Sequence, residues 1–412
     1  MARRYHKQKK EREKLAEALA APPQAPDREA APAAETPPVQ PGDRLTVRFT
    51  DVAFGGEGVA RAGEFVIFAP FVIDGELAEV RVEKVKPRFA RARLLRVIEP
   101  SPHRVEPRCP YFGVCGGCQY QHIAYERQLE LKRRQVREVL HRLGGVDPET
   151  VRPPVPCPRP YHYRNRLMVR SWWSRAEERM FVGFLRRESR WVVDVEECAL
   201  AEPALNEELR RVRADPPRRS GLKKALRLPP EGWVVPPDSF FQNNFFMLPK
   251  LAETARERLA DAGSRFLIDA YCGVGFFAVE LAGAVERFAG VEIDAQAVRA
   301  ARLNAARRGA ENGEFIRGSA EEKLPRLLAD FTPEASTIIL DPPRVGCAPS
   351  TVEALRAARP AQILYVSCHP ATLARDLKRL CEGGLYAPRA IVPLDMFPQT
   401  QHVECVADLR KS

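Results

Sequence analysis

A cysteine in the segment 365–370, YVSCHP, has the sequence context of a nucleophile. The apolar run from Ile363 to Val366 predicts a buried strand, and Pro370 followed by leucines at helical spacing predicts a helix. Cys368 would then lie at a strand-to-helix turn near the positive end of a helix dipole, which lowers the pKa of a thiol. A small buried cysteine at a strand end is the alternative, because free cysteine is common in protein cores.

A second group of cysteines is spaced for a metal site. Cys109, Cys115 and Cys118 form a Cx5CxxC cluster that contains two adjacent glycines. Three thiols this close, with glycines that let the backbone curl around them, favour a metal or iron–sulfur site over core packing. A fourth ligand would come from Cys157 or Cys198. Spacing alone decides neither between these two residues nor between zinc and iron–sulfur.

The composition favours a polyanionic partner in a reducing compartment. The 412 residues carry a net charge of +11, which points first to nucleic acid and less to an acidic membrane surface. Ten cysteines without a secretory signal predict a cytoplasmic protein. No run of 18 apolar residues occurs, so no membrane span is expected. No obligate protein partner is evident.

The first half of the chain divides into a tail, a barrel and a mixed region. Residues 1–42 predict a basic, Pro- and Ala-rich disordered tail. Residues 43–102 alternate in short segments between glycine turns, which predicts a small all-β barrel. The last hairpin of the barrel groups Lys and Arg around Phe89, which suits RNA contact, with a solvated face as the alternative. Residues 103–235 hold the cysteine cluster and, at 161–170, aromatic residues interleaved with arginine that could face RNA.

Residues 236–412 alternate between strands and helices. This pattern predicts a doubly wound α/β sheet whose ligands lie at the carboxyl ends of the strands. The turn Gly273-Val274-Gly275 fits a dinucleotide fingerprint, with Glu292 about 20 residues on to hold a ribose. The same turn allows S-adenosylmethionine. Two features favour S-adenosylmethionine over a dinucleotide. The glycine turn lies late in the chain, and the fourth strand is followed by Asp341-Pro342-Pro343-Arg344.

Together these motifs carry a family resemblance. The segment 55–61, GGEGVAR, resembles the TRAM domain, an OB-like RNA-binding module. From about residue 43 onward the chain resembles the S-adenosylmethionine-dependent RNA uracil-5-methyltransferases, and most closely the bacterial 23S rRNA branch that contains an iron–sulfur cluster. The resemblance implies a Rossmann-like methyltransferase domain, preceded by an OB-like TRAM β-barrel and a small mixed α/β iron–sulfur domain.

The resemblance also assigns site residues. It implies Cys368 as the nucleophile and Glu404, in the segment 397–404, FPQTQHVE, as the general base. It implies cofactor contacts at Gln242, Tyr271, Glu292, Ser319 and Asp341. It implies a 4Fe-4S cluster on Cys109, Cys115, Cys118 and Cys198. The chain departs from the family pattern at four positions: His369 stands in place of Asn, Asn243 in place of Val, Phe276 in place of a polar residue, and Ser319 in place of an acidic or amide residue.

The implied reaction accounts for these residue types. Carbon 5 of uracil is a poor nucleophile until a thiolate adds to carbon 6, and a base must later remove the carbon-5 proton. We therefore expect methylation of a uridine in 23S rRNA through a covalent cysteine adduct, on a base flipped out of a looped RNA. The same reaction on tRNA is one alternative, and a non-catalytic RNA-binding protein is another. A dehydrogenase is disfavoured because no hydride-transfer constellation is present.

Overall fold

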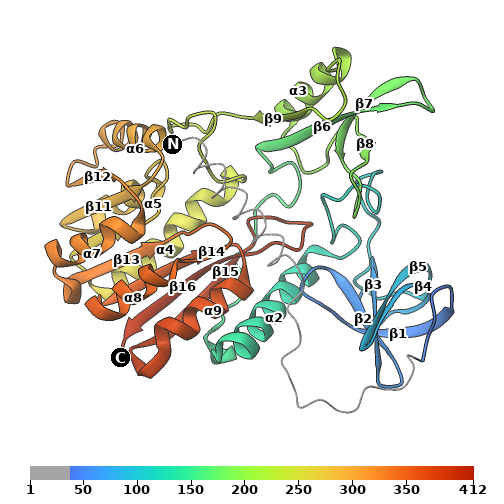
Figure 1. Cartoon of the computed structure of the whole chain (residues 1–412), viewed down its shortest axis with the longest axis horizontal. Coiled ribbons are helices and arrows are strands. Elements are labelled where there is room, and N and C mark those ends of the chain that lie inside the picture. Colours follow the sequence, from blue (N-terminus) through green and yellow to red (C-terminus); the bar gives the residue numbers. More distant parts are fainter. Residues whose placement is uncertain (1–37) are drawn as a thin grey trace.

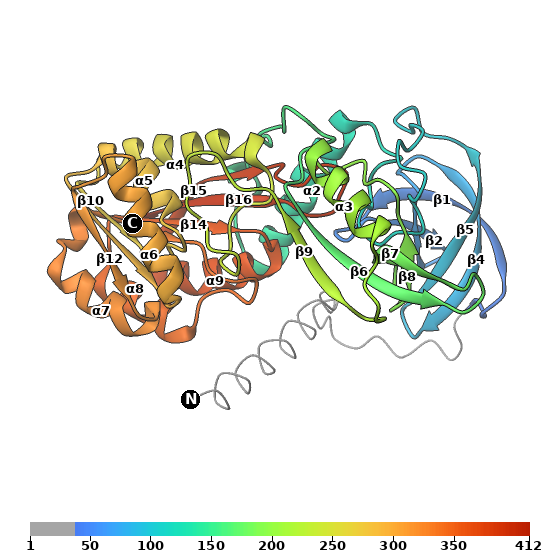
Figure 2. The same cartoon turned by 90° about the horizontal axis from the view of Figure 1, so that it is seen from above.

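The computed structural model describes residues 38–412, so most of the predicted tail, residues 1–37, lies outside the described part. Three sheets organise the described chain: a closed five-stranded barrel, a four-stranded sheet and a seven-stranded sheet. Figures 1 and 2 show the barrel and the four-stranded sheet on one side of the molecule and the seven-stranded sheet on the other. No helix among residues 38–412 combines the length and the apolar character needed to cross a membrane.

The barrel begins the described chain. Its strands are β1 (Arg44–Val52), β2 (Glu57–Ala62), β3 (Phe65–Pro70), β4 (Leu77–Lys86) and β5 (Phe89–Glu99). Inward-facing residues alternate with outward-facing ones, and the parallel pairing of β3 with β5 closes the ring. Val39 already packs in the barrel core, before the first strand. The closed barrel confirms the predicted fold of this region.

The four-stranded sheet lies in the middle of the chain and is covered on one face. It contains β6 (Arg166–Ser174), β7 (Arg179–Leu185), β8 (Val192–Asp194) and β9 (Lys223–Arg227), in the order β8-β7-β6-β9. Helix α3 (Pro203–Ala214) packs on one face through Leu205, Leu209 and Val212. Helix α2 (Tyr125–Gly144) lies outside this sheet. Its Val136 and Leu140 pack into the core of the seven-stranded sheet, so α2 ties the middle of the chain to the C-terminal part.

The seven-stranded sheet has the order β12-β11-β10-β13-β14-β16-β15. Its strands are β10 (Phe266–Asp269), β11 (Arg287–Glu292), β12 (Gly313–Arg317), β13 (Ser336–Leu340), β14 (Gln362–Ser367), β15 (Tyr386–Leu394) and β16 (Glu404–Lys411). The first five are parallel, and β16 lies antiparallel between β14 and β15. This arrangement confirms the predicted doubly wound sheet and its antiparallel end.

Helices cover both faces of this sheet. One face packs against α7 (Ala320–Asp330), α8 (Pro349–Ala358), α9 (Pro370–Cys381) and α2. The other packs against α4 (Leu248–Ala262), α5 (Phe276–Leu281) and α6 (Ala295–Arg307). The strand order reverses between β10 and β13, and ligands of doubly wound sheets bind beside such a reversal at the carboxyl ends of the strands.

Candidate active site and cysteine pocket

The pairing of β14 with β16 sets the proposed nucleophile opposite the proposed base. Ser367, the last residue of β14, pairs with Cys405 in antiparallel register. One further step along both strands places Cys368 opposite Glu404. The side chain of Glu404 is buried and that of Cys368 is partly buried. A thiol and a carboxylate far apart in the sequence therefore meet at one end of the sheet.

Burial dominates the electrostatics of this pair. The pKa of the Cys368 thiol is raised to about 12, first by burial and then by the Glu404 carboxylate, whereas Arg344 opposes both. The pKa of Glu404 is raised well above its usual range by burial and then by Asp341, again opposed by Arg344. The expected lowering of the Cys368 pKa by the dipole of α9 is wrong, because desolvation and a neighbouring carboxylate outweigh it.

His369 caps the helix that follows Cys368. Its Nδ1 atom accepts a hydrogen bond from the backbone N–H of Thr372 at 3.3 Å and lies 2.8 Å from Thr372 Oγ1. Burial lowers the pKa of His369, and Arg344 and Arg375 lower it further. The ring also lies edge-on to Phe54 of the barrel, at 6.3 Å between centroids. The imidazole thus makes the N-cap hydrogen bond that an asparagine side chain can make.

Four of the five predicted cofactor contacts end four adjacent strands. Tyr271 follows β10, Glu292 ends β11, Ser319 follows β12 and Asp341 follows β13. Glu292 holds the glycine turn, because its Oε2 accepts from the backbone N–H of Gly273 at 3.1 Å. Parallel neighbours bring these ends together at one edge of the sheet, where a nucleoside-containing ligand can bind.

The predicted cofactor contacts differ in their hydrogen-bond partners and in their pKa values. Ser319 caps α7 by accepting from the N–H of Glu322 at 3.3 Å, so its hydroxyl has a structural partner. Gln242 is buried and comes from the segment that links β9 to α4, where its carbonyl accepts from Asn165 Nδ2 at 3.0 Å. Burial raises the pKa of Asp341 to about 7. It also raises the pKa of Tyr271.

Asp269 is a buried carboxylate at this edge that the sequence interpretation did not identify. Its Oδ2 atom accepts from the N–H of Ala278 at 3.2 Å, and its Oδ1 atom has no hydrogen-bond partner. Burial and the nearby Asp341 raise its pKa to about 8. The signal was an acidic residue at the end of a strand, directly before the glycine turn. Asp269 holds the start of α5 and keeps one oxygen free.

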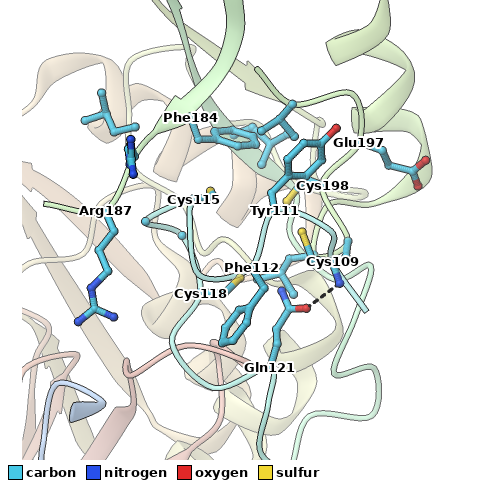
Figure 3. Close-up of a pocket in the computed structure, with 18 of the residues that line it drawn as sticks. Cys109, Tyr111, Phe112, Cys115, Cys118, Gln121, Phe184, Arg187, Glu197 and Cys198 are labelled. Atoms are coloured by element: carbon cyan, nitrogen blue, oxygen red, sulfur yellow. Dashed lines mark hydrogen bonds between the residues drawn. The ribbon is translucent and has the colours of Figure 1, made fainter. Parts of the chain in front are cut away.

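Four cysteines line one cavity beside the four-stranded sheet. Figure 3 shows the side chains of Cys109, Cys115, Cys118 and Cys198 around this cavity, whose volume is about 660 Å³. The backbone N–H of Cys109 donates to Gln121 Oε1 at 3.1 Å. Cys157 lies elsewhere, buried and in contact with Asn244 Nδ2 at 3.3 Å. The fold therefore gathers Cys198, and not Cys157, with the cysteine cluster.

The thiols of this pocket influence one another. The pKa of Cys115 is raised to about 11 and that of Cys118 to about 12, mainly by burial, and the neighbouring cysteines contribute in the same direction. Burial also raises the pKa of Cys198, which Arg164 opposes. Within residues 38–412, no group of three or more His, Cys, Asp and Glu side chains is arranged to hold a single metal ion. The cysteines thus share a cavity without forming the tight ligand set of a mononuclear site.

Comparisons with known proteins identify two regions of the chain and relatives of almost its whole length. Residues 38–95 match the TRAM domain, and residues 233–412 match the tRNA (Uracil-5-)-methyltransferase family. An uncharacterized RNA methyltransferase of Thermosynechococcus vestitus is 32% identical, with 90% of this chain and 99% of the relative covered. One from Bacillus cereus is 32% identical, with coverage of 91% and 98%.

A solved structure extends the likeness to almost the whole chain. The tRNA (uracil-54, C5)-methyltransferase of Pyrococcus abyssi, in complex with S-adenosyl-L-homocysteine, is 27% identical with a TM-score of 0.65. The match covers 89% of this chain and 100% of that one. The chain therefore belongs to the RNA uracil-5-methyltransferase family with an N-terminal TRAM domain, and it is an S-adenosylmethionine-dependent RNA (uracil-C5-)-methyltransferase.

Proposed function

We propose that this enzyme methylates carbon 5 of a uridine in 23S rRNA through a covalent bond between Cys368 and carbon 6 of the base. The observation that carries this proposal is the placement of Cys368 opposite Glu404, at the sheet edge where Glu292 ends β11 and Asp341 follows β13. This arrangement offers a nucleophile and a base beside the expected position of the methyl donor.

The steps use these two side chains in turn. The thiolate of Cys368 adds to carbon 6, and the electrons of the carbon 5–carbon 6 double bond become available at carbon 5. Carbon 5 then takes the methyl group, whose bond to the sulfonium breaks and leaves a neutral thioether. The Glu404 carboxylate removes the proton from carbon 5. The electrons of that C–H bond re-form the double bond, and the bond to sulfur breaks to release Cys368 as a thiolate.

Arg344 supports the first step. Its guanidinium hydrogen-bonds to the Cys368 thiol, and its charge lowers the pKa of that thiol against the raising effects of burial and Glu404. A positive charge beside the sulfur favours the thiolate, which is the reactive form. The same charge favours the carboxylate form of Glu404, so Arg344 assists both groups.

The cysteine pocket offers the kind and number of ligands that a 4Fe-4S cluster takes. Such a cluster is held by four cysteine thiolates, and four thiols line this one cavity. We propose Cys109, Cys115, Cys118 and Cys198 as the ligands. A bound cluster would cross-link segments that are distant in the sequence.

The charge of Arg164 also suits a negative group in this pocket. Its Nε atom is buried and has no hydrogen-bond partner. The charged forms of Tyr163, Cys198 and Cys118 are the main groups that raise the pKa of its guanidinium, and none of them is a carboxylate. A buried cation normally needs a counter-charge. Thiolates bound to iron would supply that charge.

Iron analysis should test the cluster directly. We expect the wild-type protein, purified without oxygen, to be brown and to contain about four irons per chain. Cys198→Ser should lose most of this iron and the visible absorbance. Cys157→Ser is the matched control and should retain both, because Cys157 lies outside the pocket. A colourless wild-type protein without iron, or iron loss in the Cys157 variant alone, would contradict the ligand set.

The face of the four-stranded sheet opposite α3 is suited to RNA. The register brings Arg170 beside Lys223, and Trp172 meets Trp191 edge-on at 5.1 Å between ring centroids. Trp191 is 59% exposed. Exposed aromatic rings beside cations stack bases and hold phosphates. Within the segment 161–170, which the sequence predicted as an RNA surface, Tyr163 is instead buried, with its hydroxyl donating to the carbonyl of Pro398 at 3.0 Å.

The choice of substrate can be tested by methyl transfer. We propose 23S rRNA because the cysteine cluster and the barrel resemble those of the 23S rRNA branch, whereas the solved relative from Pyrococcus abyssi is named for tRNA. Transcribed 23S rRNA fragments and tRNA would be incubated with labelled S-adenosylmethionine, and 5-methyluridine would be mapped by mass spectrometry. Label in 23S rRNA is the expected result. Label only in tRNA would favour the alternative, and label in neither would refute the proposed chemistry on these RNAs.

A further inference from the structure

The loop before Glu404 is held by parts of the chain outside the methyltransferase sheet. This loop, residues 395–403, joins β15 to β16 and is called the base loop below. In Figure 1 it is drawn in red and extends from the sheet towards the middle of the chain. Because Glu404 is the first residue of β16, the path of the base loop fixes the direction in which the Glu404 side chain enters the site.

Gln399 is the point at which the base loop is held most firmly. Its φ angle is +67°, a left-handed conformation that is unfavourable for a residue with a side chain. It is 2% exposed. Its carbonyl accepts two hydrogen bonds, from the N–H of Gln119 at 3.1 Å and from the N–H of Tyr120 at 3.0 Å. A strained, buried residue persists only where its surroundings determine its conformation, and here those surroundings directly follow Cys118 in the sequence.

Helix α2 supplies the second half of this contact. Gln128 is fully buried, and its Nε2 donates to Gln399 Oε1 at 2.9 Å while its Oε1 accepts from the N–H of Gln399 at 3.0 Å. The same Nε2 donates to the carbonyl of Ile123 at 2.8 Å, which fixes the amide orientation. A paired amide of this kind restricts both the position and the rotation of Gln399.

Further contacts hold the base loop on both sides of Gln399. Lys132 of α2 forms a buried ion pair with Asp395 at 2.6 Å and donates to the carbonyl of Phe397 at 3.1 Å. Gln119 Oε1 accepts from the N–H of Gln401 at 3.2 Å. The barrel closes over the same place, since a Cβ atom at Gly56 would lie 3.0 Å from Gln119 Cβ.

From these contacts we propose that Gln128 and Gln119 are positioning residues for Glu404, and that the segment after the cysteine cluster thereby sets the geometry of proton removal. The inference rests on the proposed role of Glu404 as the base. It gives the segment after the cysteine cluster a role at a catalytic site on a different sheet, because the groups that hold Gln399 lie outside that sheet. Only the last step of the reaction should depend on this contact, because Cys368 is carried by β14 and α9.

The test separates the last step from the earlier ones. Gln128→Met keeps the size of the side chain and removes its hydrogen bonds to Gln399, and Glu130→Met is the control at an exposed position of the same helix. The substrate is a uridine-containing fragment of 23S rRNA, called ordinary RNA below. Two quantities are measured on it: the rate of methyl transfer, and the amount of covalent enzyme–RNA adduct that survives denaturing electrophoresis. The same RNA with 5-fluorouridine in place of uridine forms a covalent complex with the enzyme that cannot be released, since fluorine at carbon 5 cannot leave as a proton. The rate of this trapping reports thiol addition and methyl transfer and does not depend on the general base.

We expect Gln128→Met to lower turnover about 10- to 100-fold, the usual effect of a small misplacement of a catalytic group. The adduct on ordinary RNA should accumulate, and the trapping rate on 5-fluorouridine RNA should match that of wild type and of Glu130→Met. Gln119→Ala removes fewer contacts and should show a smaller effect in the same direction, which covers the case in which Gln128→Met fails to fold.

Other outcomes overturn the inference. A parallel fall of turnover and trapping in both glutamine variants would mean that the contact serves general stability. Unchanged turnover in both variants would mean that the base loop needs no such support. Glu404→Gln is measured beside them: if it neither accumulates adduct nor loses turnover, the assignment of the base has failed. If it does accumulate adduct while the glutamine variants do not, only the positioning role has failed.

Discussion

Cys368→Ala is expected to abolish methyl transfer, with a loss of at least about 10⁴-fold in turnover. Without a thiolate at carbon 6, carbon 5 of uracil has too little electron density to attack a methyl group. The loss should appear as absence of label in RNA incubated with labelled S-adenosylmethionine. It should also appear as absence of any covalent complex with RNA containing 5-fluorouridine.

Cys381→Ala gives the matched control for this variant. Cys381 is the last residue of α9, the helix that begins two residues after Cys368, and its thiol is partly buried. We expect this variant to keep its activity, because the thiol lies at the far end of the helix. Residual transfer by Cys368→Ala near the wild-type level, or a complete loss in Cys381→Ala, would show that the nucleophile has been assigned to the wrong residue.

The position of the cofactor site could be predicted because the alternation of strands and helices along the chain indicates a parallel sheet, and ligands of such a sheet bind at the carboxyl ends of its strands. Parallel strands bring their carboxyl ends to one edge, so Tyr271, Glu292 and Asp341 were expected to lie together, and they do. The family motif supplied Glu404. What brings Glu404 to Cys368 is the antiparallel register of β16 against β14, and such a register depends on which side chains face the core.

The electrostatics and the support of the site could not be predicted in the same way. The dipole argument for Cys368 used only local sequence, whereas the direction of its pKa shift is set by tertiary burial and by Glu404. Gln128 and Gln399 are 271 positions apart in the sequence, and neither their residue type nor their spacing indicates that their side chains meet. Asp269 does stand at the end of a strand before the glycine turn, but its burial and its hydrogen bond with the N–H of Ala278 become visible only in the fold. These features arise from packing between distant segments, which periodicity does not describe.

Glu404→Gln should stop the reaction after the methyl group has moved, so that enzyme remains bound to methylated RNA. The amide has nearly the shape of the carboxylate but cannot take the proton from carbon 5, and the bond between sulfur and carbon 6 then has no route to break. We expect turnover to fall by about 10²- to 10⁴-fold, as for the loss of a general base. Denaturing electrophoresis should show an adduct with ordinary uridine RNA that the wild-type enzyme does not accumulate.

The pH dependence provides an independent check on the same residue. Burial raises the pKa of Glu404 above its usual range, so the carboxylate that can accept a proton becomes more abundant as the pH increases. Release of the adduct by the wild-type enzyme should therefore become faster with rising pH through the raised pKa, and the residual release by Glu404→Gln should lose this dependence. Glu353→Gln, an exposed position on α8, should behave as wild type. If Glu404→Gln releases RNA at the wild-type rate, a different group removes the proton; if it loses turnover without accumulating adduct, Glu404 acts before the covalent step.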